Sequence, residues 1–268
     1  MKMIVDAHTH LLPDRLAAAI RRFFADRGME DFSYPTDHRT VLDRHHADGI
    51  DTIWNLPYAH KAGMASALNE AMLEASAAVA DHPVTVLPGC TVHPDDADPV
   101  ADFDAAIDAG AKILKLHCSV GDYEADDPRL APVLASAGQR HVPVVIHAGH
   151  SPTGFTMENE IAPIGRAAAA NPGTKIILAH FGHEAFLQAV TLLDEQPNVV
   201  ADLTPVTGSP VPLTVEIAER LRDRIIFGSD APNTRMAAGE LLAGLRTLGI
   251  SDSTLDKILS TNARALTA

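Results

Sequence analysis

Histidines that follow short apolar runs are the residues of this sequence whose spacing could support chemistry. The chain has 268 residues, of which 14 are histidine, and His8 and His10 form a His-x-His pair after the first apolar run. Residues two apart on a strand point to the same side, so both imidazoles can bind one ion. Three imidazoles and one carboxylate leave a coordination position for water, as in catalytic zinc sites. A metal held in this way would lower the pKa of its water from 15.7 to about 7 and supply hydroxide at neutral pH.

Further residues of this kind lie where later apolar runs end. The full set comprises His8, His10, Lys115, His117, His147, His180 and Asp230. Each member has a simpler explanation: a His-x-His pair often arises by chance, a strand-end histidine is often only hydrogen-bonded, and Asp230 could cap the following helix. The His8/His10 pair, the Lys115/His117 pair, His147, His180 and Asp230 are five such coincidences. Their occurrence together at one end of one fold favours a metal site.

Eight continuously apolar, β-branched runs are expected to form the strands that position these residues. They cover residues 3–7, 51–56, 84–92, 112–116, 142–146, 174–179, 198–203 and 224–227, with helical stretches between them. Continuous apolar runs are typical of strands buried on both faces. The alternation predicts an α/β fold, a single-domain (β/α)8 TIM barrel over residues 1–268, whose strand ends meet at one mouth. An open doubly wound sheet is the alternative, but no G-x-G-x-x-G or phosphate loop follows any strand.

Composition narrows the classes of function. The chain has 35 acidic and 21 basic residues, a net charge of −14 that repels phosphate backbones and argues against nucleic-acid binding. No apolar run approaches the roughly 18 residues of a membrane-spanning helix, and the N-terminus lacks the features of a signal peptide. The two cysteines, Cys90 and Cys118, suit a reducing cytoplasm. We therefore expect a cytoplasmic protein that acts on a small molecule.

Two segments depart from the regular alternation. Residues 11–49 form an excursion longer than one helix needs, which we expect to cover the barrel mouth. It concentrates the aromatic residues Phe23, Phe24, Phe32 and Tyr34, which could pack, line a substrate pocket or form a homodimer contact. Residues 251–268 are expected to form one or two extra helices on the outside of the barrel.

Several other residues are weaker candidates. Tyr58, His60 and His183 are possible substrate contacts, whereas His45, His46 and His82 are expected to be solvated and Cys118 to lie in the core. His93 could face the mouth or support its loop, and Asp202 could contact substrate or orient a ligand. Arg39 and Arg235 are the loop arginines expected near the mouth.

The ordered motifs resemble the amidohydrolase superfamily, in particular its amidohydrolase-2 branch, which includes aminocarboxymuconate-semialdehyde decarboxylase. The similarity extends over nearly the whole chain. It rests on Asp-Ala-His-Thr-His at residues 6–10, Leu-Asn-Glu at 68–70, His-Pro at 82–83, Lys-Leu-His at 115–117, Val-Ile-His-Ala-Gly at 145–149, Leu-Ala-His-Phe-Gly at 178–182, Phe-Gly-Ser-Asp-Ala-Pro at 227–232 and Asn-Ala-Arg at 262–264.

This resemblance implies one divalent metal, usually zinc, held by His8, His10, His147 and Asp230. It also implies that His180 acts as the general base on the metal-bound water, with Asp230 as the other proton carrier. In binuclear relatives a carboxylated lysine on the fourth strand bridges two metals, and Lys115 occupies that strand. The Lys-Leu-His pattern is more similar to the mononuclear branch, in which His117 would line the substrate pocket. Lys115 as a bridging ligand stays the alternative, and Lys115 and Arg235 are further candidate substrate contacts.

The resemblance leaves the reaction open, because one fold supports many reactions. We expect a hydrolase acting on an amide, lactone or ester-like carbonyl, since hydrolysis is the commoner chemistry of the superfamily. A non-oxidative decarboxylase or hydratase of a small carboxylic acid is the alternative and would need a cation to pair the substrate carboxylate, for which Arg39 and Arg235 are candidates. A metal-binding barrel without catalysis is a third class.

Overall fold

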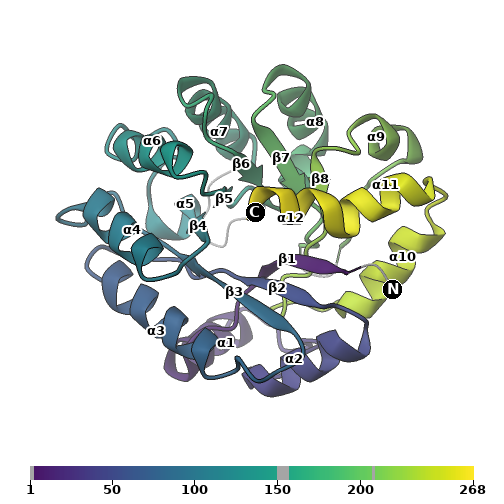
Figure 1. Ribbon diagram of the computed structural model, residues 1–268, viewed down its shortest axis with the longest axis horizontal. Helices are drawn as coiled ribbons and strands as arrows, with labels where there is room; N and C mark the ends of the chain where they lie inside the picture. The colour runs from purple at the N-terminus through teal and green to yellow at the C-terminus, as the bar shows by residue number, and fades with distance from the viewer. Residues whose placement is uncertain (1–2, 150–156, 207–208) are drawn as a thin grey trace.

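Eight parallel strands form one sheet in the order β1 to β8 in the computed structural model, which describes residues 3–149, 157–206 and 209–268 (Figure 1). The strands are β1 (Val5–Thr9), β2 (Thr52–Asn55), β3 (Thr85–Cys90), β4 (Ile113–Leu116), β5 (Val144–Ile146), β6 (Ile176–Leu178), β7 (Val199–Asp202) and β8 (Ile225–Ile226). The barrel is completed where Ala7 N donates to Phe227 O at 2.9 Å and Thr9 forms a parallel bridge with Ala231. The predicted (β/α)8 barrel is therefore confirmed.

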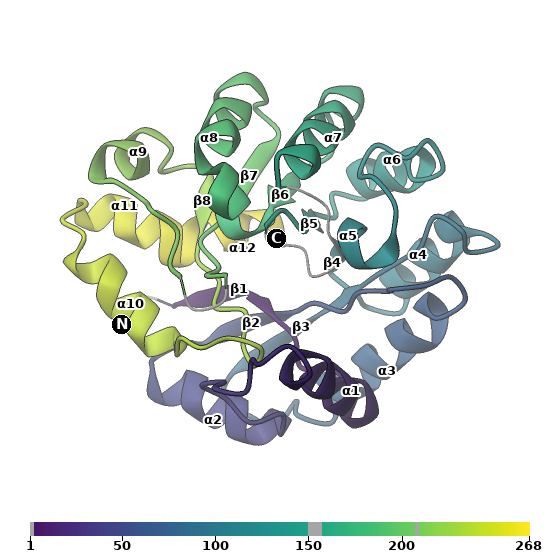
Figure 2. The same cartoon turned by 180° about the vertical axis from the view of Figure 1, so that it is seen from behind.

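Helices surround the strands on all sides in Figures 1 and 2. They are α1 (Asp14–Ala25), α2 (His38–Ala47), α3 (Ala65–Ala77), α4 (Pro99–Asp108), α5 (Cys118–Gly121), α6 (Ala131–Gln139), α7 (Met157–Ala170), the 3-10 segment η1 (Ala179–Ala185), α8 (Phe186–Glu195), α9 (Val215–Arg220), α10 (Ala238–Thr247), α11 (Asp252–Asp256), the π-helical turn η2 (Lys257–Thr261) and α12 (Asn262–Leu266). None of the described helices is long and apolar enough to cross a membrane.

The apolar core has two layers because the strands are buried on both faces. The interior layer fills the barrel and includes Val5 and Ala7 of β1, Trp54 of β2 and Ile113 of β4. The larger outer layer packs the opposite strand faces against the surrounding helices. Cys118 is buried in this outer layer, as predicted.

Strand β1 contains an irregularity that directs the His-x-His pair. Its pairing with β2 shifts register between Asp6 and Thr9. Ala7 belongs to the interior layer, and the next residue, His8, also points inward, since its ring contacts Lys115 and Asp202. Two consecutive inward side chains require such a β-bulge, because an unbroken strand alternates its faces.

The excursion between β1 and β2 contains two helices, α1 and α2. Helix α1 packs through Leu16 and Ile20 against Leu68 and Met72 of α3. Figure 2 shows it at the end of the barrel opposite the C-terminal helices. The described contacts of the aromatic residues tie the excursion to itself and to α10. Phe24 contacts Phe32, Arg21 lies 3.9 Å above the Phe32 ring, and the buried Tyr34 hydroxyl accepts a 2.7 Å hydrogen bond from Ala238 N.

The C-terminal helices correct one expectation, because they do not simply pack on the outside. Ala263 of α12 is fully buried within the interior layer, and Leu266 packs against it. Phe227 N donates a 3.0 Å hydrogen bond to Ile258 O of η2. The tail therefore closes the end of the barrel at which the strands begin.

The aromatic contacts predict that Tyr34 acts through stability. Tyr34→Phe leaves the buried Ala238 N–H without an acceptor, which costs about 1–3 kcal/mol. For a domain of this size, the melting temperature should fall by roughly 2–10 °C while kcat/KM is unchanged. Tyr123→Phe is the matched control, because the buried Tyr123 hydroxyl has no hydrogen-bond partner among the described residues. A lower kcat/KM with an unchanged melting temperature in Tyr34→Phe would contradict this prediction.

Candidate metal centre at the barrel mouth

Three potential ligand atoms converge where β1 and β8 end. The ring nitrogens of His8 and His10 and a carboxylate oxygen of Asp230 all lie within 4.8 Å of one another. His8 Nε2 is 3.2 Å from His10 Nε2, and Asp230 Oδ1 is 3.2 Å from His10 Nε2 and 3.8 Å from His8 Nε2. Both histidines are buried, and the Asp230 side chain is 21% exposed. The structure thus brings together three of the four predicted ligands.

The hydrogen bonds of the two histidines fit a metal at this point. His8 Nδ1 lies 2.7 Å from Asp202 Oδ2, and His10 Nδ1 lies 2.6 Å from Leu56 O. Both partners are acceptors, so each Nδ1 carries the proton and each Nε2 can present its lone pair. Burial, followed by the charges of Lys115 and His10, lowers the pKa of His8 well below its ordinary value. Two converging imidazole nitrogens and a carboxylate are a donor set suited to a divalent ion.

His147 and His180 form a neighbouring pair instead of completing this group. His180 Nε2 is 3.1 Å from His147 Nδ1, and the His147 ring stacks on His117 with a centroid distance of 3.7 Å. Burial is the main cause that lowers the pKa of all three histidines well below the ordinary value. His147 Nε2 and His180 Nδ1 are buried and have no hydrogen-bond partner among the described residues. The role of His147 as the fourth ligand stays a prediction.

Asp202 connects the two histidine groups. The sequence left open whether it contacts substrate or orients a ligand. Besides holding His8 through Oδ2, it accepts a 2.8 Å hydrogen bond from His180 N through Oδ1. The His8 and His180 ring centroids are 5.2 Å apart. The carboxylate therefore orients a candidate ligand and the candidate general base at once.

Lys115 is a fully buried cation beside this group. Its Nζ lies 3.2 Å from His8 Nε2. Burial lowers the pKa of Lys115 to about 8, although the charges of Asp202 and Asp230 raise it. The amine is therefore poised between its charged and neutral forms close to physiological pH.

The predicted substrate contacts Tyr58, His60 and His183 differ in burial and in their described contacts. Tyr58 lies edge-on to His10, with a ring-centroid distance of 5.5 Å, and 5.1 Å from the His117 ring. His183 is half-buried in η1, three residues after His180, whereas His60 is exposed.

The two arginines expected near the mouth both form ion pairs with aspartates. Arg39 lies within α2 and not in a loop, and it pairs with Asp81 at 2.7 Å, so that expectation was wrong. Arg235 pairs with Asp31 at 2.7 Å.

Two histidine expectations are also decided by the structure. His93 is buried, and its Nε2 hydrogen-bonds to Gly121 O at 2.9 Å, so it supports its loop. His45 was expected to be solvated, which is wrong, because it is fully buried and pairs with Asp6 at 3.0 Å. His45 lies on the face of α2 that packs against β1. The sequence does not indicate this orientation, because Arg44, His45 and His46 are three consecutive polar residues in a short helix.

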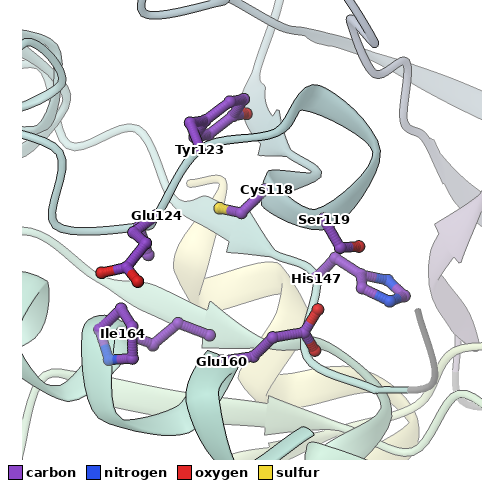
Figure 3. Close-up of a pocket in the computed structure, with 9 residues that line it drawn as sticks. Cys118, Ser119, Tyr123, Glu124, His147, Glu160 and Ile164 are labelled. Atoms are coloured by element: carbon purple, nitrogen blue, oxygen red, sulfur yellow. The ribbon is translucent and has the colours of Figure 1, made fainter. Parts of the chain in front are cut away.

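Glu160 was missed by the sequence analysis. It is buried on α7 and borders a cavity of about 10 Å³, together with His147, Cys118 and Tyr123 (Figure 3). Its Oε2 accepts a 2.8 Å hydrogen bond from Gly149 N. Burial raises the pKa of Glu160 to about 7. No motif marks this residue, because only the tertiary packing of α7 brings it beside His147 and the Gly149 backbone that follow β5.

The chain is similar to one protein family and to several solved structures. The amidohydrolase-2 family model, described as amidohydrolase, matches residues 5–266. An uncharacterised TIM-barrel protein from Bordetella bronchiseptica superimposes with a TM-score of 0.76 at 20% identity, covering 98% of both chains. The 5-carboxyvanillate decarboxylase LigW from Sphingomonas paucimobilis gives 0.73 at 14% identity, covering 100% of this chain and 99% of the other.

A second 5-carboxyvanillate decarboxylase, from Novosphingobium aromaticivorans and complexed with manganese, gives a TM-score of 0.67 at 14% identity, covering 100% and 96%. At these identities the likeness shows the fold alone. No curated protein matches the sequence significantly.

The converging donors predict that the purified protein binds about one divalent ion per chain. His8→Ala and Asp230→Ala should each remove the ion or weaken its binding severely, because each deletes one converging donor. Elemental analysis and competition with a chelator measure this. His147→Ala tests the fourth ligand in the same way, and His60→Ala, at an exposed histidine, is the control. Full metal occupancy in the His8→Ala/Asp230→Ala double variant would refute the site.

Glu160 predicts a pH dependence of stability. Its pKa is raised from 4.5 to about 7 in the folded protein, so the unfolded chain loses the proton first as pH rises. Stability is therefore lost between about pH 4.5 and 7, by roughly 3–4 kcal/mol at about 1.4 kcal/mol per pH unit. Glu160→Gln should remove this loss, so its stability relative to the wild type should increase from pH 5 to pH 8 in urea unfolding. Glu124→Gln, at a largely exposed carboxylate bordering the same cavity, is the control, and equal pH dependence in all three proteins would contradict the prediction.

Proposed function

Because the chain belongs to the amidohydrolase-2 family, we propose that it is a metal-dependent hydrolase of a small-molecule amide, lactone or ester-like carbonyl. The observation that carries this proposal is the convergence of His8, His10 and Asp230 within 4.8 Å. Zinc is the ion we propose, because it accepts imidazole nitrogen and carboxylate oxygen in this arrangement. When bound, such an ion lowers the pKa of water to about 7 and polarises a carbonyl oxygen.

His180 is the residue we assign as general base. Its imidazole is neutral at pH 7, since burial lowers its pKa well below the ordinary value, and a neutral ring can accept a proton. Its backbone is held by Asp202, and its Nδ1 has no hydrogen-bond partner among the described residues. Asp230 is the second group that could carry a proton at this site, because its carboxylate reaches His10 at 3.2 Å.

The pairing of the two arginines and the net charge of the chain favour an uncharged carbonyl substrate. Arg39 and Arg235, the arginines expected to pair a substrate carboxylate, are each paired with an aspartate. The net charge of −14 also repels anions over the whole molecule. Tyr58 and His117 offer aromatic surface beside the ligand group, and we propose them as substrate contacts.

A non-oxidative decarboxylase or hydratase is the second candidate. It is favoured by Lys115, whose pKa of about 8 leaves it largely protonated at pH 7 and able to pair a carboxylate. The neighbouring fold of 5-carboxyvanillate decarboxylase is consistent with this chemistry. A substrate panel that records both acid release by hydrolysis and CO2 release separates the two reactions. Metal binding without turnover on the whole panel would favour a non-catalytic barrel.

Substitution of His180 tests the assigned general base. His180→Asn should retain most of the metal and lose about 10²–10⁴-fold in kcat, the usual effect of removing a general base. Metal analysis and steady-state kinetics on the same preparation provide the two measurements. His46→Asn is the control at an exposed histidine of α2. Joint loss of metal and activity in His180→Asn would instead identify His180 as a ligand.

A further inference from the structure

A buried carboxylate outside the barrel connects the two segments that carry the candidate ligands. Asp6 is fully buried, and its Oδ1 accepts hydrogen bonds from His8 N at 3.2 Å and Ser229 N at 3.0 Å. The first of these groups lies at the β-bulge that turns His8 inward, and the second directly precedes Asp230. Asp230 N in turn donates to His8 O at 2.9 Å. The Asp6 carboxylate therefore fixes both segments relative to each other.

His45 of α2 supplies the partner of the remaining Asp6 oxygen. Its Nε2 is 3.0 Å from Asp6 Oδ2, and its Nδ1 is 2.9 Å from Val41 O. Both partners are acceptors, so both ring nitrogens must donate, and the ring is an imidazolium. Burial lowers the pKa of His45, but the hydrogen bond and charge of Asp6 outweigh it and raise the pKa above the ordinary value. The charged ring is fully buried and lies beside the Tyr34 ring.

We infer that His45 is a positioning residue for the metal centre: through Asp6 it fixes the backbone at His8 and Ser229, and thereby the spacing of His8, His10 and Asp230. This inference rests on the proposed metal site. A buried carboxylate that loses its counter-charge is destabilised in its site and moves toward water. This movement weakens the hydrogen bonds to the two N–H groups, and the ligand-bearing segments are no longer held together.

Groups behind a metal ligand commonly change metal affinity 10–100-fold when they are removed. His45 differs from Asp202, which contacts the His8 ring directly, because it acts only through the backbone. A residue that merely stabilised the fold would lower the melting temperature and leave the metal affinity of the folded protein unchanged. Metal affinity and local backbone protection therefore distinguish the two roles.

Three variants test this inference in the full-length chain. His45→Leu removes the cation, and His45→Gln keeps one donor without the charge. The double variant Asp6→Asn/His45→Gln replaces the ion pair by two neutral amides that can still hydrogen-bond. His46→Leu is the matched control, because His46 is the next residue of α2 and is exposed. The measurements are the Zn²⁺ dissociation constant by competition with a chromogenic chelator, and amide hydrogen exchange at His8 and Ser229 in metal-stripped protein.

We expect His45→Leu to weaken Zn²⁺ binding 10–100-fold and to speed amide exchange at both positions, with His45→Gln intermediate. The neutral pair should recover affinity to within about threefold of the wild type, and His46→Leu should change neither measurement. The inference would be overturned if folded His45→Leu had the Zn²⁺ affinity and the amide exchange rates of the wild type. If His45→Leu does not fold, wild-type affinity and exchange rates in His45→Gln would overturn the inference instead. Absence of Zn²⁺ binding by the wild type would refute the metal site itself, whereas the exchange measurement would still report on His45.

Discussion

The bulge in β1 is the structural feature on which the candidate site depends. Without it, His8 would follow Ala7 onto the opposite face of the strand, away from Lys115, Asp202 and His10. A bulge leaves backbone groups that must find other partners, and here a side-chain carboxylate takes that role. The position of His8 and His10 therefore depends on the buried Asp6 carboxylate and its partner His45 on the outer side of the barrel.

Buried carboxylates organise the site on both sides of that strand. Inside the barrel, Asp202 binds the His8 ring and the His180 backbone, and it also accepts from Thr204 N at 3.1 Å. A carboxylate in a low-dielectric interior is stable only when its oxygens accept hydrogen bonds or face a cation. Because these partners lie on β1, on η1 and in the segment after β7, one acidic side chain fixes the relative position of several elements.

Burial also sets the charge of the imidazoles at the mouth. It lowers the pKa of His8, His117, His147 and His180, so these rings are neutral near pH 7 and can accept a proton or a metal. Lys115 shares the same low-dielectric space, and its pKa of about 8 reflects the same cost of burying a charge. The site therefore combines neutral nitrogen donors with acidic groups and one titratable amine.

The sequence by itself determined the barrel and the end of it at which the chemistry lies, because continuous apolar runs define buried parallel strands and their carboxyl ends share one mouth. It therefore placed His8, His10, His180 and Asp230 at the mouth. Only the tertiary structure decided that His147 lies against His180 and His117, that Arg39 and Arg235 pair with aspartates, and that Asp6, His45 and Glu160 surround the site. The physical reason is that strand periodicity fixes the face on which a side chain lies, whereas its rotamer, burial and partners depend on elements distant in the chain.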